Sequence, residues 1–184
     1  MLQRQPVQPL GAVLRLATAL LSACCDFETQ HMVHRDIKPE NLLIGPNGKI
    51  WIIDFGIVRL LQLTSATLTQ QRFGLFTPGY GAPEQVRNLK PKIDARADLF
   101  SVGVVLYESF NGSNPYLAGK GNVLEIVQDL CNRDLPLLTI PGDIDGKLSE
   151  FVASLCARFP SRRPPNAREA LQWFREIVGG LGTM

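Results

Sequence analysis

Two polar clusters in the first third of the chain carry side chains that are suited to phosphate chemistry. Asp36, Lys38 and Asn41 form the first cluster. The second is the acidic position Asp54, which lies thirteen residues after Asn41. Carboxylate and carbonyl oxygens are the ligands that Mg²⁺ prefers, and a lysine ammonium group offers a positive charge to phosphate. These four residues are therefore candidates for a site that binds a divalent metal ion and phosphate.

A β-hairpin is the element that must bring the two clusters together. Two apolar, β-prone runs, 42–44 and 50–53, are separated by the turn residues Gly45-Pro46-Asn47-Gly48. Because the second strand of a hairpin returns to the end where the first began, we expect Asn41 and Asp54 to face one ligand.

The order and spacing of these residues resemble those of the protein kinase family. His34-Arg35-Asp36, with Asn41 five residues after Asp36, is similar to the catalytic loop, and Asp54-Phe55-Gly56 resembles the metal-binding triplet. Ala82-Pro83-Glu84 is similar to the end of the activation segment. The resemblance extends from about Leu10 to Val178.

The resemblance implies an α+β, protein-kinase-like fold. The expected part is the mainly α-helical C-lobe, with small β-hairpins carrying the catalytic and metal-binding loops. Residues 1–184 would then be a single partial kinase domain with a core at about 10–178.

The resemblance also implies a role for each residue of the two clusters. Asp36 would accept or orient the proton of a substrate hydroxyl, and Lys38 would neutralise the γ-phosphate of ATP. Asn41 would hold one Mg²⁺, and Asp54 would bridge Mg²⁺ to the phosphates. Lysine at position 38 is typical of kinases that act on Ser/Thr, and so is Thr77, which would contact both Asp36 and Lys38.

Five residues are expected to be structural. In the family the histidine at position 34 supports the phenylalanine of the metal-binding triplet, here Phe55, and Asp98 would tether the catalytic-loop backbone from the start of a buried helix. A lone buried carboxylate is costly, so Glu84 needs a partner. Arg163 stands where the family places that partner.

A further set of residues is predicted to be regulatory. Arg35 and Arg59 could together clamp a phosphorylated side chain of the activation loop. Thr67 and Thr69, with Thr64 and Ser65, are candidate phosphorylation sites. Two alternatives stay open: Arg59 as a plain surface charge, and the hydroxyl-rich loop as an unmodified one.

The segment before Thr77 departs from the family pattern. Residues 72–76 contain no hydroxyl group where the family usually carries its switch threonine. Phe76 replaces the usual glycine, and its bulk removes backbone freedom. This substitution predicts some distortion of the substrate-binding turn.

Composition favours one globular domain. The chain has 184 residues, and its net charge of +2 gives no reason to expect nucleic acid or a membrane surface as partners. Four cysteines without metal-binding spacing are typical of free thiols in a reducing cytoplasm. The apolar run from Leu10 to Cys25 contains Arg15, so it is predicted to be a core helix over 10–30 rather than a signal peptide or membrane span.

Four more helices are expected. The segment that begins at Asp98 resembles the family's central buried helix, and it has little polar side, as expected of a helix that is buried all round. Helices over 121–132, 147–158 and 166–178 are expected to bury their apolar positions; the inward residues of the first and third are Val123, Ile126, Val127, Leu130, Ala170, Leu171, Phe174 and Ile177.

The family's glycine-rich loop, strand lysine and helix glutamate have no counterpart before His34. We therefore expect an apolar surface near Leu43 and Ile53 where an upper lobe would lie. Three interpretations remain: a fragment of a Ser/Thr protein kinase, an inactive lobe that binds protein substrates or another kinase chain, and a truncated gene product without activity.

Overall fold

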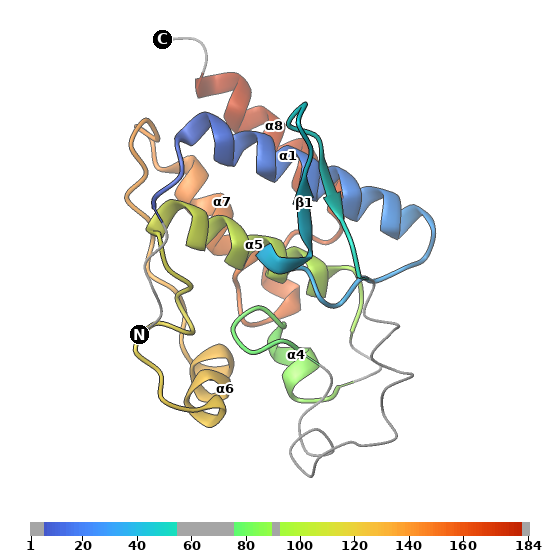
Figure 1. Ribbon diagram of the computed structural model, residues 1–184, viewed down its shortest axis with the longest axis vertical. Helices are drawn as coiled ribbons and strands as arrows, with labels where there is room; N and C mark the ends of the chain where they lie inside the picture. Colours follow the sequence, from blue (N-terminus) through green and yellow to red (C-terminus); the bar gives the residue numbers. More distant parts are fainter. Residues whose placement is uncertain (1–5, 55–75, 90–92, 182–184) are drawn as a thin grey trace.

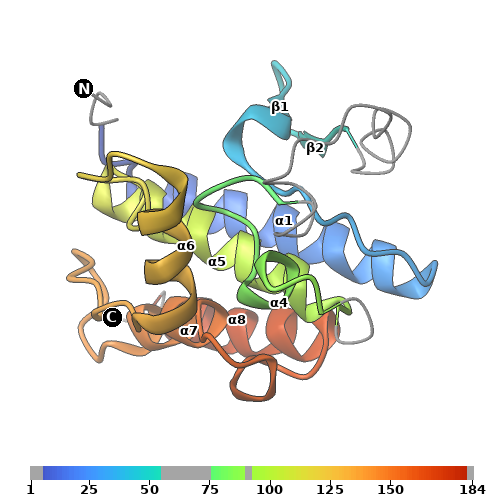
Figure 2. The same cartoon turned by 90° about the horizontal axis from the view of Figure 1, so that it is seen from below.

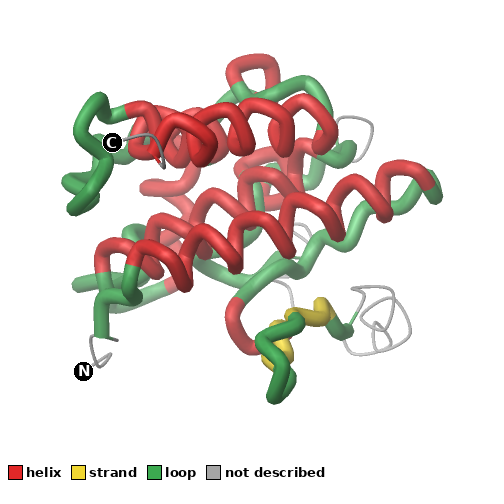
Figure 3. Tube along the Cα trace, turned by 90° about the horizontal axis from the view of Figure 1, so that it is seen from above, coloured by secondary structure: helices red, strands yellow, loops and turns green. Residues whose placement is uncertain are grey.

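The structure is a computed structural model that describes residues 6–54, 76–89 and 93–181. Helices make up most of the described chain, and the strands form one small antiparallel sheet (Figures 1 and 3). This architecture confirms the predicted α+β class. In chain order the elements are α1 (Leu10–Thr29), η1 (Pro39–Asn41), β1 (Leu42–Ile44), β2 (Ile50–Ile52), α4 (Pro83–Val86), α5 (Arg96–Asn111), α6 (Val123–Asn132), α7 (Lys147–Leu155), η4 (Pro160–Arg162) and α8 (Ala167–Leu181).

Helix α5 is the centre of the core. Every residue from Ala97 to Tyr107 is buried, as an all-round apolar sequence requires. It contacts α1 on one side and α7 on another (Figure 2). Gly103 allows the close approach of α7, because a Cβ atom at that position would lie 2.7 Å from the Cβ of Leu155. The helix stops at Gly112, whose φ of 74° suits glycine.

Helix α1 is a core helix, as predicted. Among the described helices it alone is long and apolar enough to cross a membrane by length and composition. Its apolar stripe is instead buried in the protein core, and the helix packs against α5 and α8. Its C-terminal end is tied to α8, because the side chain of Glu28 accepts a hydrogen bond from the backbone N–H of Ala167 (3.0 Å). The stripe consists of Val13, Ala17, Leu20, Leu21 and Cys24.

The three C-terminal helices exist as predicted, but their ends differ. Helix α6 begins at Val123 because Asn122 caps it by accepting a hydrogen bond from the N–H of Glu125 (3.1 Å). The prediction that Val123 faces inward is wrong: it is 40% exposed, at the first turn of the helix. Helix α8 continues three residues beyond the prediction, to Leu181, and its four predicted inward positions are buried.

The hairpin forms at the predicted turn, and its two strands are antiparallel. Leu43 pairs with Trp51 and Ile44 with Ile50, and β2 lies against α1. Leu43 (52% exposed) and Trp51 (43%), which pair across the two strands, form one exposed apolar face, and Ile44 (71%) is exposed on the opposite face at the end of β1. Ile53 lies beyond β2 and is only half-buried, so the exposed surface is centred further toward the turn than expected.

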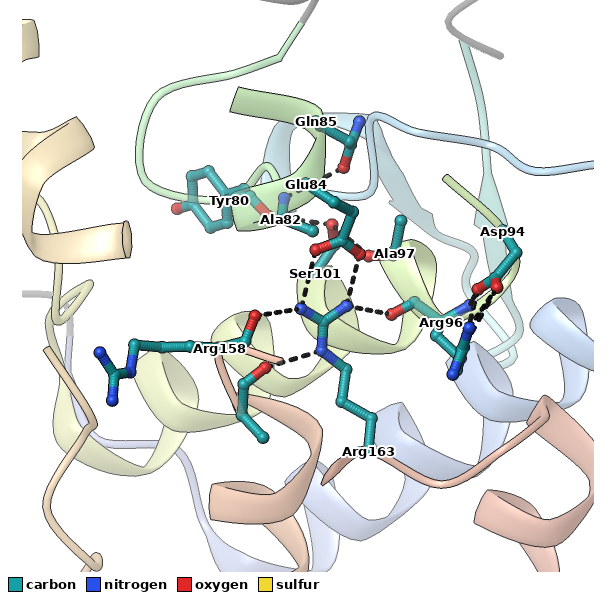
Figure 4. Close-up of polar contacts among 11 residues, drawn as sticks. Tyr80, Ala82, Glu84, Gln85, Asp94, Arg96, Ala97, Ser101, Arg158 and Arg163 are labelled. Atoms are coloured by element: carbon teal, nitrogen blue, oxygen red, sulfur yellow. Dashed lines mark hydrogen bonds and ion pairs between the residues drawn. The ribbon is translucent and has the colours of Figure 1, made fainter. Parts of the chain in front are cut away.

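A buried ion pair joins α4 to Arg163, the residue that follows η4 (Figure 4). Two guanidinium nitrogens of Arg163 donate to the carboxylate of Glu84 at 2.6 and 3.0 Å, across 79 residues of sequence. Arg163 also donates to the carbonyls of Ala157, Arg158 and Arg96. These bonds hold the chain after Leu155 in a turn, which is why α7 ends three residues before its predicted end.

We predict that Arg163→Met lowers the free energy of unfolding by about 3–5 kcal/mol, because it leaves a buried carboxylate without its partner. Urea denaturation followed by circular dichroism measures the loss. The matched control is Arg162→Met, on the neighbouring exposed arginine, with an expected change within about 0.5 kcal/mol. Equal losses in the two variants would contradict a specific role for the ion pair.

Candidate active site

Hydrogen bonds to one carboxylate of α5 hold the loop between α1 and η1 in place. Asp98 is buried, and its two oxygens accept hydrogen bonds from the backbone N–H groups of His34 (2.7 Å) and Arg35 (2.8 Å). Burial raises the pKa of Asp98 to about 6, and these two N–H bonds oppose the rise. The tether expected at this position is therefore present.

The backbone of Arg35 is strained and is clamped on both sides. Its φ is 67°, a left-handed conformation that costs a bulky residue roughly 1–2 kcal/mol. Asp98 holds its N–H, and Gln85 donates to its carbonyl at 3.0 Å. The other end of the Gln85 amide accepts from the N–H of Ala82 (3.0 Å) (Figure 4). Side chains from α4 and α5 therefore fix the backbone at Arg35, and this backbone conformation orients Asp36, the next residue.

The side chain of Asp36 lies at the centre of a polar cluster. Its Oδ1 accepts a hydrogen bond from the hydroxyl of Thr77 (2.5 Å), and its Oδ2 accepts from the ammonium of Lys38 (3.0 Å) and the amide of Asn41 (3.1 Å). Lys38 also donates to the Thr77 hydroxyl at 3.2 Å. Thr77 therefore reaches both residues that the resemblance predicted, and Phe76 beside it does not prevent this contact.

Asn41 and Asp54 come to the same end of the hairpin, as predicted. The N–H of Ile53 donates to the carbonyl of Asn41 at 2.9 Å, which places Asp54 next to that residue. The Asn41 amide nitrogen also donates to the carbonyl of Asp36 (2.8 Å), so its side-chain oxygen is turned away from that carbonyl. Asp54 is exposed and has a φ of 59°.

The donor set fits magnesium. Among the described residues no group of three His, Cys, Asp or Glu side chains could hold a metal ion. The available oxygens are therefore the amide of Asn41 and the carboxylate of Asp54. Mg²⁺ is usually bound by one or two protein oxygens, with water and phosphate oxygens completing its shell.

His34 is buried beneath the loop rather than directed to a substrate. Its ring stacks on Phe27 of α1 with centroids 5.6 Å apart, and its Nδ1 accepts from the N–H of Asp36 (3.3 Å). Burial lowers its pKa, which a hydrogen bond to the backbone of Ile53 partly offsets. The predicted contact with Phe55 lies outside the described residues.

The predicted regulatory residues are only partly visible. The side chain of Arg35 is exposed, and the next residue in the chain is Asp36 of the polar cluster. Arg59, Thr67 and Thr69 lie outside the described residues, so the predicted phosphate clamp stays a prediction.

The sequence reasoning missed a second polar network behind Thr77. The Tyr80 hydroxyl donates to Glu108 at 2.6 Å, and burial raises the pKa of both groups. Ser101 donates to the carbonyl of Tyr80 (2.9 Å), and Asn114 donates to that of Gly79 (3.2 Å). One signal was available: Ser101 and Glu108 are polar residues in a helix that is mostly apolar.

Comparison with known proteins identifies relatives of this chain. The model of the family described as "Protein kinase domain" matches residues 7–174. The Serine/threonine-protein kinase PknL of Mycobacterium tuberculosis is 34% identical over 168 residues, which cover 91% of this chain and 40% of that protein. For PknB of Mycolicibacterium smegmatis the identity is 33% over 165 residues, covering 89% of this chain and 26% of the relative.

A third relative is more similar over a shorter stretch. The Probable serine/threonine-protein kinase PknB of Bifidobacterium longum is 44% identical over 148 residues, covering 80% of this chain and 20% of that protein. The chain therefore spans between a fifth and two fifths of the length of these three relatives.

We predict that Asp98→Asn destabilises the protein by about 1–3 kcal/mol at pH 7, because an amide nitrogen would then face a backbone N–H donor. The folded pKa of about 6 lies above the ordinary value of 3.8, so the native state binds the proton more tightly than the unfolded chain. The part of the Asp98 contribution that depends on proton binding is therefore fully present below about pH 4 and is lost as pH rises through about 6, whereas the two N–H bonds still contribute at pH 7.

Urea titrations of the natural chain and the Asp98→Asn variant at pH 4 to 7 measure this difference. The stability advantage of the natural chain should shrink as pH rises through that window. Asp94→Asn is the control, since Asp94 is exposed and Arg96 lowers its pKa, which gives the opposite pH trend. An advantage that grows with pH in the Asp98 comparison would contradict the assignment.

Proposed function

Because this chain belongs to the protein kinase domain family, we propose that its polar cluster transfers the γ-phosphate of ATP to a Ser or Thr hydroxyl of a protein. The observation that carries the proposal is the set of bonds that Thr77, Lys38 and Asn41 make to the two oxygens of Asp36. The relatives named above are Ser/Thr protein kinases and match most of this chain.

The cluster suits proton transfer from a hydroxyl. Both oxygens of the Asp36 carboxylate are fixed by hydrogen bonds, so the side chain is oriented before a substrate arrives. In the proposed step the substrate oxygen forms a bond to the γ-phosphorus as the bond from that phosphorus to the β-phosphate oxygen breaks. Asp36 accepts the hydroxyl proton, and ADP leaves.

Lys38 supplies positive charge at the same place. Its ammonium lies 3.0 Å from Asp36 and 3.2 Å from the Thr77 hydroxyl, and its side chain is only 13% exposed. A charge that is fixed and largely shielded from water stabilises a developing phosphate charge without reorganisation. We propose that Lys38 contacts the γ-phosphate during transfer.

ATP and magnesium are the proposed co-substrate and cofactor, because protein kinases generally use both. Asn41 and Asp54 would hold Mg²⁺, which would offset charge on the β- and γ-phosphates. Four cysteines that are all free support a reducing, cytoplasmic setting for this chemistry.

We predict that the purified chain transfers phosphate from Mg²⁺-ATP to itself or to a generic basic protein. Asp36→Asn should lower the rate by roughly 10²–10⁴-fold, because the carboxylate that accepts the proton is lost. Asp54→Asn should raise the Mg²⁺ concentration that half-saturates the reaction, since one protein oxygen ligand loses its charge. Radiolabelled ATP and phosphoamino acid analysis measure the rate and the residue modified.

The control is Asp145→Asn, which removes an exposed partner of Lys147 far from the cluster in sequence and should leave the rate unchanged. Phosphotyrosine as the main product would refute the hydroxyl class. No transfer above the Asp36→Asn/Asp54→Asn double variant would refute the activity for this chain and favour a role in binding proteins.

A further inference from the structure

Phe76, which is bulky, and Gly81, which has no side chain, lie at the two ends of one tight turn. The N–H groups of Tyr80 and Gly81 both donate to the carbonyl of Thr77, at 3.1 and 3.0 Å, so residues 77–81 fold back on themselves. This turn carries Thr77, whose hydroxyl contacts Asp36. Its conformation therefore sets the geometry at the carboxylate.

The side chain of Phe76 occupies the space beside Gly81. A Cβ atom at position 81 would lie 2.6 Å from the Cβ of Phe76 and 3.4 Å from its Cγ and Cδ2. Carbon atoms do not approach to 2.6 Å, so no larger residue fits at position 81 while Phe76 holds this position. Gly81 has an ordinary φ, so only the contact with Phe76 demands glycine there.

The rest of the turn leaves little room for adjustment. Gly79 and Tyr80 are buried, and their carbonyls are bonded to Asn114 and Ser101. The N–H of Ala82 is held by Gln85, which also holds the carbonyl of Arg35. A displacement of Phe76 or residue 81 would therefore be transmitted to Thr77 on one side and to the catalytic loop on the other.

We propose that Phe76 and Gly81 are a matched pair that positions Thr77 against Asp36 and Lys38. They are positioning residues, since neither belongs to the polar cluster itself. Phe76 packs beside the backbone at Gly81 and against the core. The turn tolerates the bulk of Phe76 because position 81 has no side chain. This inference rests on the proposed phosphoryl transfer only where it is tested by measuring kcat.

The test is a double-variant cycle of the full chain: the natural protein, Gly81→Ala, Phe76→Gly, and Phe76→Gly/Gly81→Ala. Gly81→Ala should lower kcat about tenfold with Phe76 present and less than about twofold in the Phe76→Gly background. The KM for Mg²⁺-ATP should change less than about twofold throughout, because Thr77 is not a proposed ATP ligand. Rates are taken at a temperature where circular dichroism shows every variant folded.

Gly121→Ala is the matched control, because a Cβ atom there meets nothing within 4 Å. It should leave kcat unchanged. Equal losses of kcat from Gly81→Ala in both backgrounds would overturn the proposal, and so would a loss matched by Gly121→Ala.

Amide hydrogen exchange separates this proposal from the activity itself. If the natural chain transfers no phosphate, exchange at the amides of residues 80 and 81 still reports the turn. Protection should fall about tenfold in Gly81→Ala, and in the Phe76→Gly background the same change should leave it unaltered. Exchange that responds equally to Gly81→Ala in both backgrounds would overturn the pairing, whatever the outcome of the kinase assay.

Discussion

The buried carboxylate of Asp98 is the group on which the catalytic loop depends. It accepts two backbone N–H bonds from a loop 63 and 64 residues earlier in the chain. Desolvation opposes its charge, and the two N–H bonds compensate in part. Without these bonds nothing from α5 would hold Arg35 in its left-handed conformation, and Asp36 would not be aimed toward Thr77.

Other buried polar groups also connect α5 to the segments around it. Ser101 and Glu108 of this helix bind the turn after Thr77, and Arg163 binds Glu84 and the carbonyl of Arg96. The guanidinium also lies over the ring of Phe100, 4.9 Å from its centroid. A helix that is apolar nearly all round thus carries a few polar side chains, and those fix the segments that surround the proposed active site.

Tolerance to change at the site depends on shape as well as on charge. The sequence predicted that Phe76 would distort the turn, since the family usually has glycine there. Thr77 nevertheless contacts Asp36 and Lys38. The reason lies five residues further on, where Gly81 leaves the space that the aromatic side chain needs. A bulky residue can therefore preserve a local geometry when a neighbour in space leaves room for it.

The sequence by itself determined the elements and the identity of the polar cluster. The hairpin between Asn41 and Asp54 and the apolar stripe of the helix from Leu10 followed from turn residues and periodicity, which are local properties. The buried helix after Asp98 followed from the family resemblance and from its mostly apolar sequence. A buried carboxylate needs a partner, and the family resemblance indicated that the partner of Glu84 is Arg163.

Only the tertiary structure decided the contacts between segments. The clamp of Gln85 on Arg35, the end of α7 and the fit of Phe76 to Gly81 depend on distances between groups that the chain brings together only when it folds. Residue types and spacing do not give such distances, since a glycine or a glutamine can occur in a loose loop and in a tightly packed one.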